Sequence, residues 1–330
     1  MDTKELRYIV ECLPRGRTLF YYYKDLYALK LLSYAVGKEG KKVSEIKASR
    51  YARLTDKPRV KEHLSRLGTN KITKEYIDSI WPATKPSEYE CYSLSLDKWG
   101  DEKLWLRDRD YNQTARPGYN LVLQLNFSSK HNKEYKKIIN PATKWDHYAS
   151  YGHPVADNGR LLTLAWARMD IDMEKGEALI EEVQNDWIRN ALRDFKSLAK
   201  VCLDEKGNRE IRLKEKSRYG FPARAVSRYF NDTLAFHKEI WDEAMFTAAL
   251  WFIREELGIK TIYMHTHETG NVIKNLSRDF APPRSVYEKL PKKFCFEKIK
   301  EVPDFLRKYY SRNYKKIFGN ISPSFWKLSL

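Results

Sequence analysis

Apolar residues recur at two different spacings along the chain, and each spacing predicts a different kind of element. Residues 18–36 place Leu26, Leu29 and Leu32 three apart, which predicts the first long helix. Shorter helical patterns follow at residues 43–50, 57–67 and 73–80. Short helices in succession predict a helical domain over residues 1–82, with an arrangement like that of helix-turn-helix units.

Alternating apolar and polar residues dominate the middle of the chain. Residues 161–172 and 178–186 alternate in this way on either side of a turn, which predicts a β-hairpin. A long helical stretch then ends at Gly258 and is followed at once by another strand, residues 260–265. A helix that returns directly into a strand is typical of an α/β layer. We therefore expect an α/β or α+β fold, with a mixed-sheet domain over residues 91–300.

The last segment, residues 301–330, is predicted to be a basic and aromatic C-terminal helix and tail. Tyr310, Tyr314 and Phe318 recur every four residues. The basic residues between and beside them are Arg307, Lys308, Arg312, Lys315 and Lys316. Two interpretations remain open: the aromatic side chains pack on the core and leave a solvated basic face, or they form a platform on which nucleobases stack.

Composition changes this picture because the chain is strongly basic. Its 61 Lys and Arg residues exceed its 44 Asp and Glu residues by 17, and residues 284–330 alone hold 12 basic against 4 acidic residues. Such an excess is commonly used to neutralise phosphates, so we expect DNA or RNA as a partner, held mainly by the two ends of the chain. Besides the five basic residues of the C-terminal helix, the candidate contacts are Lys57, Arg59 and Lys61.

Several classes of protein are excluded by the composition. The longest apolar stretches are about ten residues, half of the ~20 that a membrane-spanning helix needs. The first ten residues carry four charges and no apolar secretory signal. The four cysteines form no CxxC pair, which favours a reduced, cytoplasmic protein. We therefore expect no membrane partner, while a protein partner stays open.

Polar groups gather at the end of the predicted hairpin. Alternation places Glu182, Gln184 and Asp186 on one face of the second strand, while Asp172 ends the first strand. Carboxylates held close together need a cation, a shared proton or a hydrogen-bond donor. The hairpin end is therefore a candidate active site. The alternative is that these are solvated charges and that Trp187 is a buried anchor.

The run from Ala178 to Trp187 resembles a Glu-Glu-Ile-Gln-Ser-Asp-Trp signature of proteins from phages and mobile elements. As in those proteins, the signature is followed by Trp241, by Gly258 and by the segment Tyr-Glu-Lys-Leu-Pro that starts at Tyr287. The resemblance implies a mobile-element or phage-defence context, and it brings no activity with it.

A looser resemblance is to the Gcn5-related acetyltransferase superfamily. The order strand, helix, Gly, strand and then Tyr-Glu-Lys-Leu is similar to the C-terminal half of that fold. The resemblance implies acetyl-CoA as cofactor, Glu182 on the strand of the general base, and Tyr287 as the group that protonates the leaving thiolate. The chain departs from the superfamily in one respect: residues 187–206 contain no Gly, so the usual pyrophosphate-binding turn is absent from the sequence.

The same residues also resemble the core of restriction-endonuclease-like nucleases. Asp172, nine intervening residues and then Glu182-Val183-Gln184 match its pattern of an acid followed by Glu-x-Gln. The resemblance implies that Asp172 and Glu182 hold Mg²⁺ or Mn²⁺, and that Gln184 orients the attacking water.

Two histidines form a further candidate metal site. His265 and His267 stand two residues apart on a predicted strand, so both side chains could reach one metal ion. The alternative is a pair of strand-end histidines that hydrogen-bond to their neighbours. Our main hypothesis is a nucleic-acid-associated protein with a candidate active site at the hairpin, either a nuclease or an acetyltransferase-like transferase. A non-catalytic nucleic-acid or protein interaction module stays open.

Overall fold

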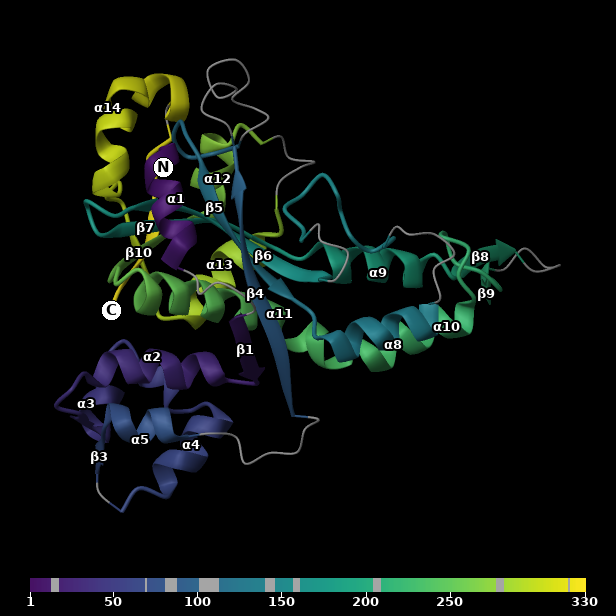
Figure 1. Ribbon diagram of the computed structural model, residues 1–330, viewed down its shortest axis with the longest axis horizontal. Coiled ribbons are helices and arrows are strands. Elements are labelled where there is room, and N and C mark those ends of the chain that lie inside the picture. Colours follow the sequence, from purple (N-terminus) through teal and green to yellow (C-terminus); the bar gives the residue numbers. More distant parts are fainter. Residues whose placement is uncertain are drawn as a thin grey trace.

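The chain folds around one large mixed sheet with helices on both faces (Figure 1). The computed structural model describes residues 1–12, 18–68, 70–80, 88–100, 113–139, 146–156, 161–203, 209–276, 282–319 and 321–330. In sheet order, the eight strands are β1 (Thr18–Tyr23), β4 (Tyr89–Trp99), β5 (Asn120–Asn126), β6 (Thr163–Asp172), β7 (Glu177–Gln184), β10 (Thr261–His265), β12 (Phe325–Ser329) and β11 (Glu297–Ile299). The expectation of a mixed α/β architecture is confirmed.

One pair of neighbours in this sheet is parallel, and every other described pair is antiparallel. β7 and β10 run side by side from Glu177 opposite Thr261 to Ile180 opposite Met264. β7 then continues to Gln184, whereas β10 ends at His265. The last residues of β7 therefore lie beyond the parallel pairing.

The predicted β-hairpin is confirmed as β6 and β7, but its register contains a shift. Arg168 pairs with Glu182, and the next residue, Met169, pairs with Ile180. Glu181 is thus an extra residue on β7, which is the arrangement of a β-bulge. A bulge breaks the strict alternation of side chains, so the faces assigned to this strand by alternation change at Glu181.

Helices cover the two faces of the sheet as separate layers (Figure 1). On one face, α11 (Ala235–Trp251) packs on the central strands and is flanked by α2 (Leu26–Val36) and α13 (Arg284–Lys293). On the other face lie α1 (Thr3–Cys12), α12 (His267–Ile273) and α14 (Asp304–Phe318). No helix in the described parts of the chain is both long and apolar enough to cross a lipid bilayer.

A group of short helices precedes β4 and lies below α11 in Figure 1. Besides α2, it consists of α3 (Val43–Lys47), the 3-10 turn Ala52–Leu54, α4 (Pro58–Ser65), α5 (Lys74–Ser79) and the ribbon of β2 (Lys41–Lys42) with β3 (Lys71–Ile72). The apolar side chains of these helices belong to the same buried cluster as those under the sheet. The helical group thus shares its core with the sheet.

Two segments differ from the sequence prediction. Residues 18–23 were predicted as the start of a helix, but they form β1, which pairs with β4. Residues 325–329, expected to belong to a C-terminal tail, form β12 between β10 and β11. The predicted C-terminal helix is confirmed as α14.

An arm of smaller elements projects from one side of the sheet (Figure 1). It is built from α8 (Ser129–Ile139), α9 (Asp186–Lys196), α10 (Ala223–Arg228) and the ribbon of β8 (Ala199–Leu203) with β9 (Arg209–Leu213). A π-helical turn, Tyr229–Thr233, connects α10 to α11, and a second one, Phe252–Glu256, ends α11.

Candidate active site

The signature run ends a strand and starts a helix. Asn185 caps α9, since its side-chain oxygen accepts a hydrogen bond from the Ile188 amide at 2.8 Å. Asp186 is the first residue of α9, where a carboxylate is favoured by the helix dipole. Trp187 is fully buried and donates a 2.7 Å hydrogen bond to the Tyr229 hydroxyl. Trp187 is thus a buried anchor, as the alternative interpretation proposed, but the neighbouring Asp186 is buried and not solvated.

Glu182 lies between two buried cations. Arg168 Nη2 donates to Glu182 Oε2 at 2.8 Å, and Lys274 Nζ donates to the same oxygen at 3.3 Å. Burial alone would raise the pKa of Glu182, but Lys274 and Arg168 together lower it below its ordinary value. Burial lowers the pKa of Lys274, and Glu182 partly restores it. The carboxylate is therefore ionised at neutral pH.

Glu181, the extra residue of the bulge, reaches the same guanidinium. Its Oε2 lies 3.8 Å from Arg168 Nη2, and its Oε1 accepts a 2.8 Å hydrogen bond from the Ala115 amide. Burial raises the pKa of this carboxyl group. In the gap beyond the parallel pairing, the Glu181 carbonyl accepts from Lys274 Nζ at 2.7 Å and from the Tyr287 hydroxyl at 3.3 Å. Lys274 and Tyr287 thus occupy the hydrogen-bonding edge that β10 leaves free.

Asp186 holds a histidine that comes from a distant loop. His153 Nδ1 lies 2.8 Å from Asp186 Oδ2, and Trp166 Nε1 donates to the same oxygen at 3.2 Å. Gln184 Nε2 donates to Asp186 Oδ1 at 2.7 Å, and Arg189 also pairs with that oxygen. Burial would raise the pKa of Asp186, but the hydrogen bond with His153 and the other donors lower it. The ionised carboxylate therefore fixes the orientation of the His153 ring.

These groups surround a small cavity, which we call the hairpin cavity. Its volume is about 260 Å³. The side chains that line it include Trp99, His153, Trp166, Arg168, Glu182 and Gln184. Arg168 stacks its guanidinium over the Trp99 ring at 5.4 Å. The cavity thus combines two indole rings, an ionised carboxylate and a histidine whose orientation is fixed.

Asp172 does not join this site. It pairs with Glu177 at the turn end of the hairpin, four positions along β6 from Arg168, or about 13 Å at the usual strand rise. Its carboxylate lies 3.4 Å from Arg116 Nη1. Asp172 and Glu182 are therefore too far apart to share a metal ion. Among the described residues, no three His, Cys, Asp or Glu side chains come together as a metal site.

The two histidines lie on different elements, which corrects the idea of a pair on one strand. β10 ends at His265, Thr266 caps α12 with its side chain, and His267 is the first residue of that helix. His265 is fully buried, and burial holds the pKa of its ring well below the ordinary value. His267 Nε2 lies 3.2 Å from the Pro282 carbonyl oxygen. The strand therefore ends before it could present both rings on one face.

The predicted nucleic-acid contacts differ in how freely they are presented. Lys57 lies over the Tyr27 ring at 5.9 Å, and Arg59 pairs with Glu88, whereas Lys61 is exposed. The candidate cations on α14 are Arg307, Lys308, Arg312, Lys315 and Lys316, and all of them are exposed. Of the α14 aromatics, Tyr310 and Phe318 are buried and Tyr314 is 41% exposed. The arrangement agrees with a helix that packs its aromatic residues on the core.

The sequence did not point to His153, Arg168 or Lys274 as members of the site, nor to the two indoles, Trp99 and Trp166. The only available signals were a lone histidine in a Gly- and Pro-containing loop and two cations among many. Comparisons of the chain with protein-family models, with curated proteins and with solved structures find no match. The interpretation of the site therefore rests on its own geometry.

Proposed function

We propose that this protein is an acyltransferase-like enzyme in which the hairpin cavity holds an amine and His153 removes its proton. The observation that carries the proposal is the 2.8 Å contact between His153 Nδ1 and the buried Asp186 carboxylate at the wall of the cavity. His153 Nδ1 also lies 2.9 Å from Gln184 Nε2, so the role of the ring depends on its tautomer. In the tautomer in which Nδ1–H donates to Asp186, Nε2 keeps a lone pair, which is the arrangement of a general base.

An amine suits the composition of this cavity. The indole rings of Trp99 and Trp166 can pack against an amine, whereas Glu182 is already paired with Arg168 and Lys274. The described residues that line the cavity include no Ser, Thr or Cys. Among the described lining residues, this favours a nucleophile on the substrate over Glu182, which is held by two cations.

The topology of the sheet supports an acyl thioester such as acetyl-CoA as the donor. β7 and β10 are parallel and their pairing ends at Ile180, and a parallel pair with a gap beyond it favours the acetyltransferase-like fold. In such a transfer the amine nitrogen bonds to the acyl carbon, its proton goes to His153, and the C–S bond breaks. The thiolate then takes a proton, for which the buried hydroxyl of Tyr287 is the candidate.

Binding of the cofactor would differ from the usual mode in two respects. The helix that follows β7 begins with Asp186 and lacks a Gly-rich turn, so its N-terminus is poorly suited to a pyrophosphate. In addition, the Glu181 carbonyl in the gap between the strands is already taken by Lys274 and Tyr287. We therefore expect the phosphates of the donor to be held by other residues.

The first test is binding of acetyl-CoA to the full chain, followed by thermal unfolding. A ligand that binds only the folded state raises the melting temperature once its concentration exceeds its Kd. We expect a shift with acetyl-CoA below millimolar concentration, and no shift at any concentration would refute the donor.

The second test is release of the CoA thiol in the presence of small amines. We expect turnover that His153→Gln reduces by at least 100-fold, in line with the usual contribution of a general base. His147→Gln is the matched control, because His147 lies in the same loop but does not line the cavity. Equal losses in both variants, or none in either, would contradict the role of His153. If no amine leads to release of the thiol, the result would instead favour the non-catalytic interaction module.

A further inference from the structure

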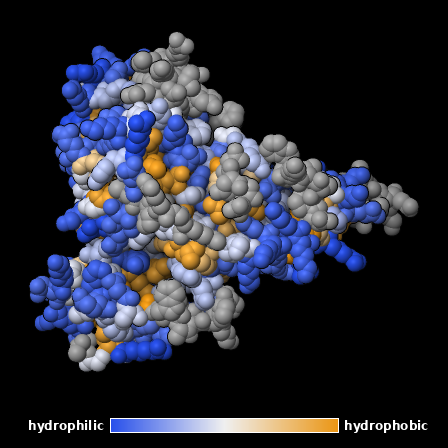
Figure 2. Space-filling view, viewed as in Figure 1, coloured by the Kyte–Doolittle hydropathy of each residue, from blue (hydrophilic) through white to orange (hydrophobic). Residues whose placement is uncertain are grey.

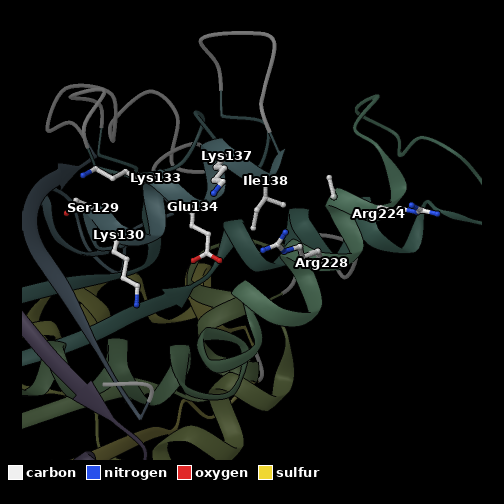
Figure 3. Close-up of a pocket in the computed structure, with 9 residues that line it drawn as sticks. Ser129, Lys130, Lys133, Glu134, Lys137, Ile138, Arg224 and Arg228 are labelled. Atoms are coloured by element: carbon white, nitrogen blue, oxygen red, sulfur yellow. The ribbon is translucent and has the colours of Figure 1, made fainter. Parts of the chain in front are cut away.

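A second and larger hollow lies on the arm, between α8 and α10 (Figure 3). Its volume is about 770 Å³. Five of the residues that line it are cations, namely Lys130, Lys133 and Lys137 from α8 and Arg224 and Arg228 from α10. We call this hollow the basic groove. It shares no lining residue with the hairpin cavity, so it is a separate surface.

The basic groove carries more cations than carboxylates among the residues that the structure describes. All five cations are exposed, and none of them forms an ion pair with a described carboxylate. The one acidic residue of the lining, Glu134, accepts a 3.2 Å hydrogen bond from the Thr233 hydroxyl. By contrast, Arg168 and Lys274 at the hairpin cavity are both paired with Glu182. The groove therefore offers an excess of positive charge to a ligand.

The cations are spaced like a track for a charged chain. Lys130, Lys133 and Lys137 stand three and four residues apart, so they share one face of α8. At the helical rise they extend over about 10 Å, which matches about three phosphates of one strand. Arg224 and Arg228 stand four residues apart on α10, and in Figure 3 Arg228 points toward α8 while Arg224 points away from it. Cations from two helices of one hollow can flank a single backbone.

We infer that the basic groove binds the phosphate backbone of a nucleic acid and does not read its bases. The described residues of the lining include no aromatic side chain, so they provide no platform on which a base could stack. The apolar residues described in the lining are Ile138 and Ala225, and neither is large enough to insert into a lipid layer. Figure 2 shows the surface of this part of the arm as mostly hydrophilic. The hollow form and the excess of cations together favour a backbone over a membrane surface.

This inference places the nucleic acid in the middle of the chain. The charge along the sequence instead predicts contacts at the two ends of the chain, where the basic excess is largest. Charge density along a sequence does not show which cations are brought together, and α8 and α10 are about 90 residues apart in the chain. Binding in the groove and binding on the exposed face of α14 can therefore be told apart by substitutions at each place.

The experiment measures binding of fluorescein-labelled 20-nucleotide DNA duplex, RNA duplex and single-stranded DNA to the full chain by fluorescence anisotropy. Five neutralised phosphates predict a slope of about −4.5 for log affinity against log salt with DNA duplex. Affinity should then fall about 500-fold when salt rises fourfold, from about 50 to 200 mM. The three labelled nucleic acids share the phosphate chemistry, so their relative affinities identify the form that the groove accepts.

Two triple variants with equal loss of charge locate the contact. In the first, Lys130, Lys133 and Lys137 of α8 are changed to Gln, which leaves two cations and a slope of about −1.8. In the second, Lys308, Lys315 and Lys316 of α14 are changed to Gln, and the slope should stay that of the wild type. Gln is nearly as good a helix former as Lys, so both helices should remain folded.

Three outcomes would overturn the inference. One is a groove variant that keeps the wild-type slope while the α14 variant loses it. Another is affinity that does not change with salt. The third is binding of anionic phospholipid vesicles, or of heparin, with no binding of any of the three nucleic acids. Binding of a nucleic acid that depends on the groove would support the inference whether or not acetyl-CoA binds. The inference can therefore hold even if the proposed function is refuted.

Discussion

Two buried histidines should make the stability of this protein sensitive to mild acid. His131 and His237 lie in an aromatic cluster under the sheet, with ring centroids 5.4 Å apart. Burial lowers the pKa of His131 to about 4 and that of His237 to about 3. The rings are hydrogen-bonded as neutral groups: His131 Nε2 lies 3.0 Å from the Tyr229 hydroxyl, and His237 Nδ1 lies 2.8 Å from the Tyr92 hydroxyl.

The size of the effect follows from proton linkage. An unfolded histidine has a pKa of about 6.5, so between that value and the lowered folded pKa the unfolded state binds the extra proton. The stability that these groups contribute is complete above pH 6.5 and is lost as the pH falls toward the folded pKa. Relative to neutral pH, each histidine lowers the unfolding free energy of the protein at pH 5 by about 2 kcal/mol, and the pair lowers it by about 4 kcal/mol.

The assay is urea unfolding at pH 7.5 and pH 5.0, with the wild type compared to the double variant His131→Phe, His237→Phe. All other titrating groups are common to both proteins and cancel in the difference. We expect the wild type to lose about 4 kcal/mol more than the double variant between the two pH values. Equal losses in the two proteins would refute the reasoning, because the buried rings would then not exclude the proton.

Three further variants test the packing and the charges. Lys274→Met removes one of the two cations that compensate the buried charge of Glu182, and it should lower the unfolding free energy, measured in urea, by about 3 kcal/mol. Adding Glu182→Gln to this variant should recover part of the loss in the same assay. Trp187→Ala removes a fully buried indole, and should cost about 4 kcal/mol in the same assay. Gly40→Ala puts a Cβ 2.8 Å from the Ile72 carbonyl oxygen at a φ of +71°, and should lower the melting temperature, with a cost of about 1–2 kcal/mol.

The elements that the sequence predicted well are those whose pattern is local. The hairpin of β6 and β7 has alternating side chains and a turn at Gly176, which adopts a φ of +62°. α14 has aromatic residues every four positions, of which Tyr310 and Phe318 are buried and Tyr314 is partly exposed. In each case the residues that specify the element lie within it.

β1 was mistaken for helix because its boundary depends on a distant residue. The run Thr18–Tyr23 continues without a break into the apolar residues of α2. The chain turns between them at Asp25, which has a φ of 68°, and the Asp25 amide donates a 3.2 Å hydrogen bond to Glu243 on α11. A turn held by a carboxylate more than two hundred residues away leaves no local signal.

Only part of the candidate site could be predicted from the sequence, for a related reason. Alternation assigns Glu181 and Glu182 to opposite faces, but the bulge lets both carboxylates approach Arg168. His153 reaches Asp186 only because the loop that carries it folds over the end of the hairpin. Bulges and loop contacts are set by tertiary packing, so neither could be derived from spacing.

The pairing of charges in space changes what the acidic hairpin can do. An acidic segment in a chain of net charge +17 suggests a cation site, yet the carboxylates there are already paired with cations and hydrogen-bond donors of the protein. Glu182 is compensated by Arg168 and Lys274, and Asp186 by Arg189 with three further donors. A metal ion would have to displace these partners and leave buried cations unpaired, which is costly. Proton transfer by His153 needs no such displacement. The same reasoning points to the basic groove as a site for an anion, because its five cations outnumber the one described carboxylate of its lining and form no ion pair with any described residue.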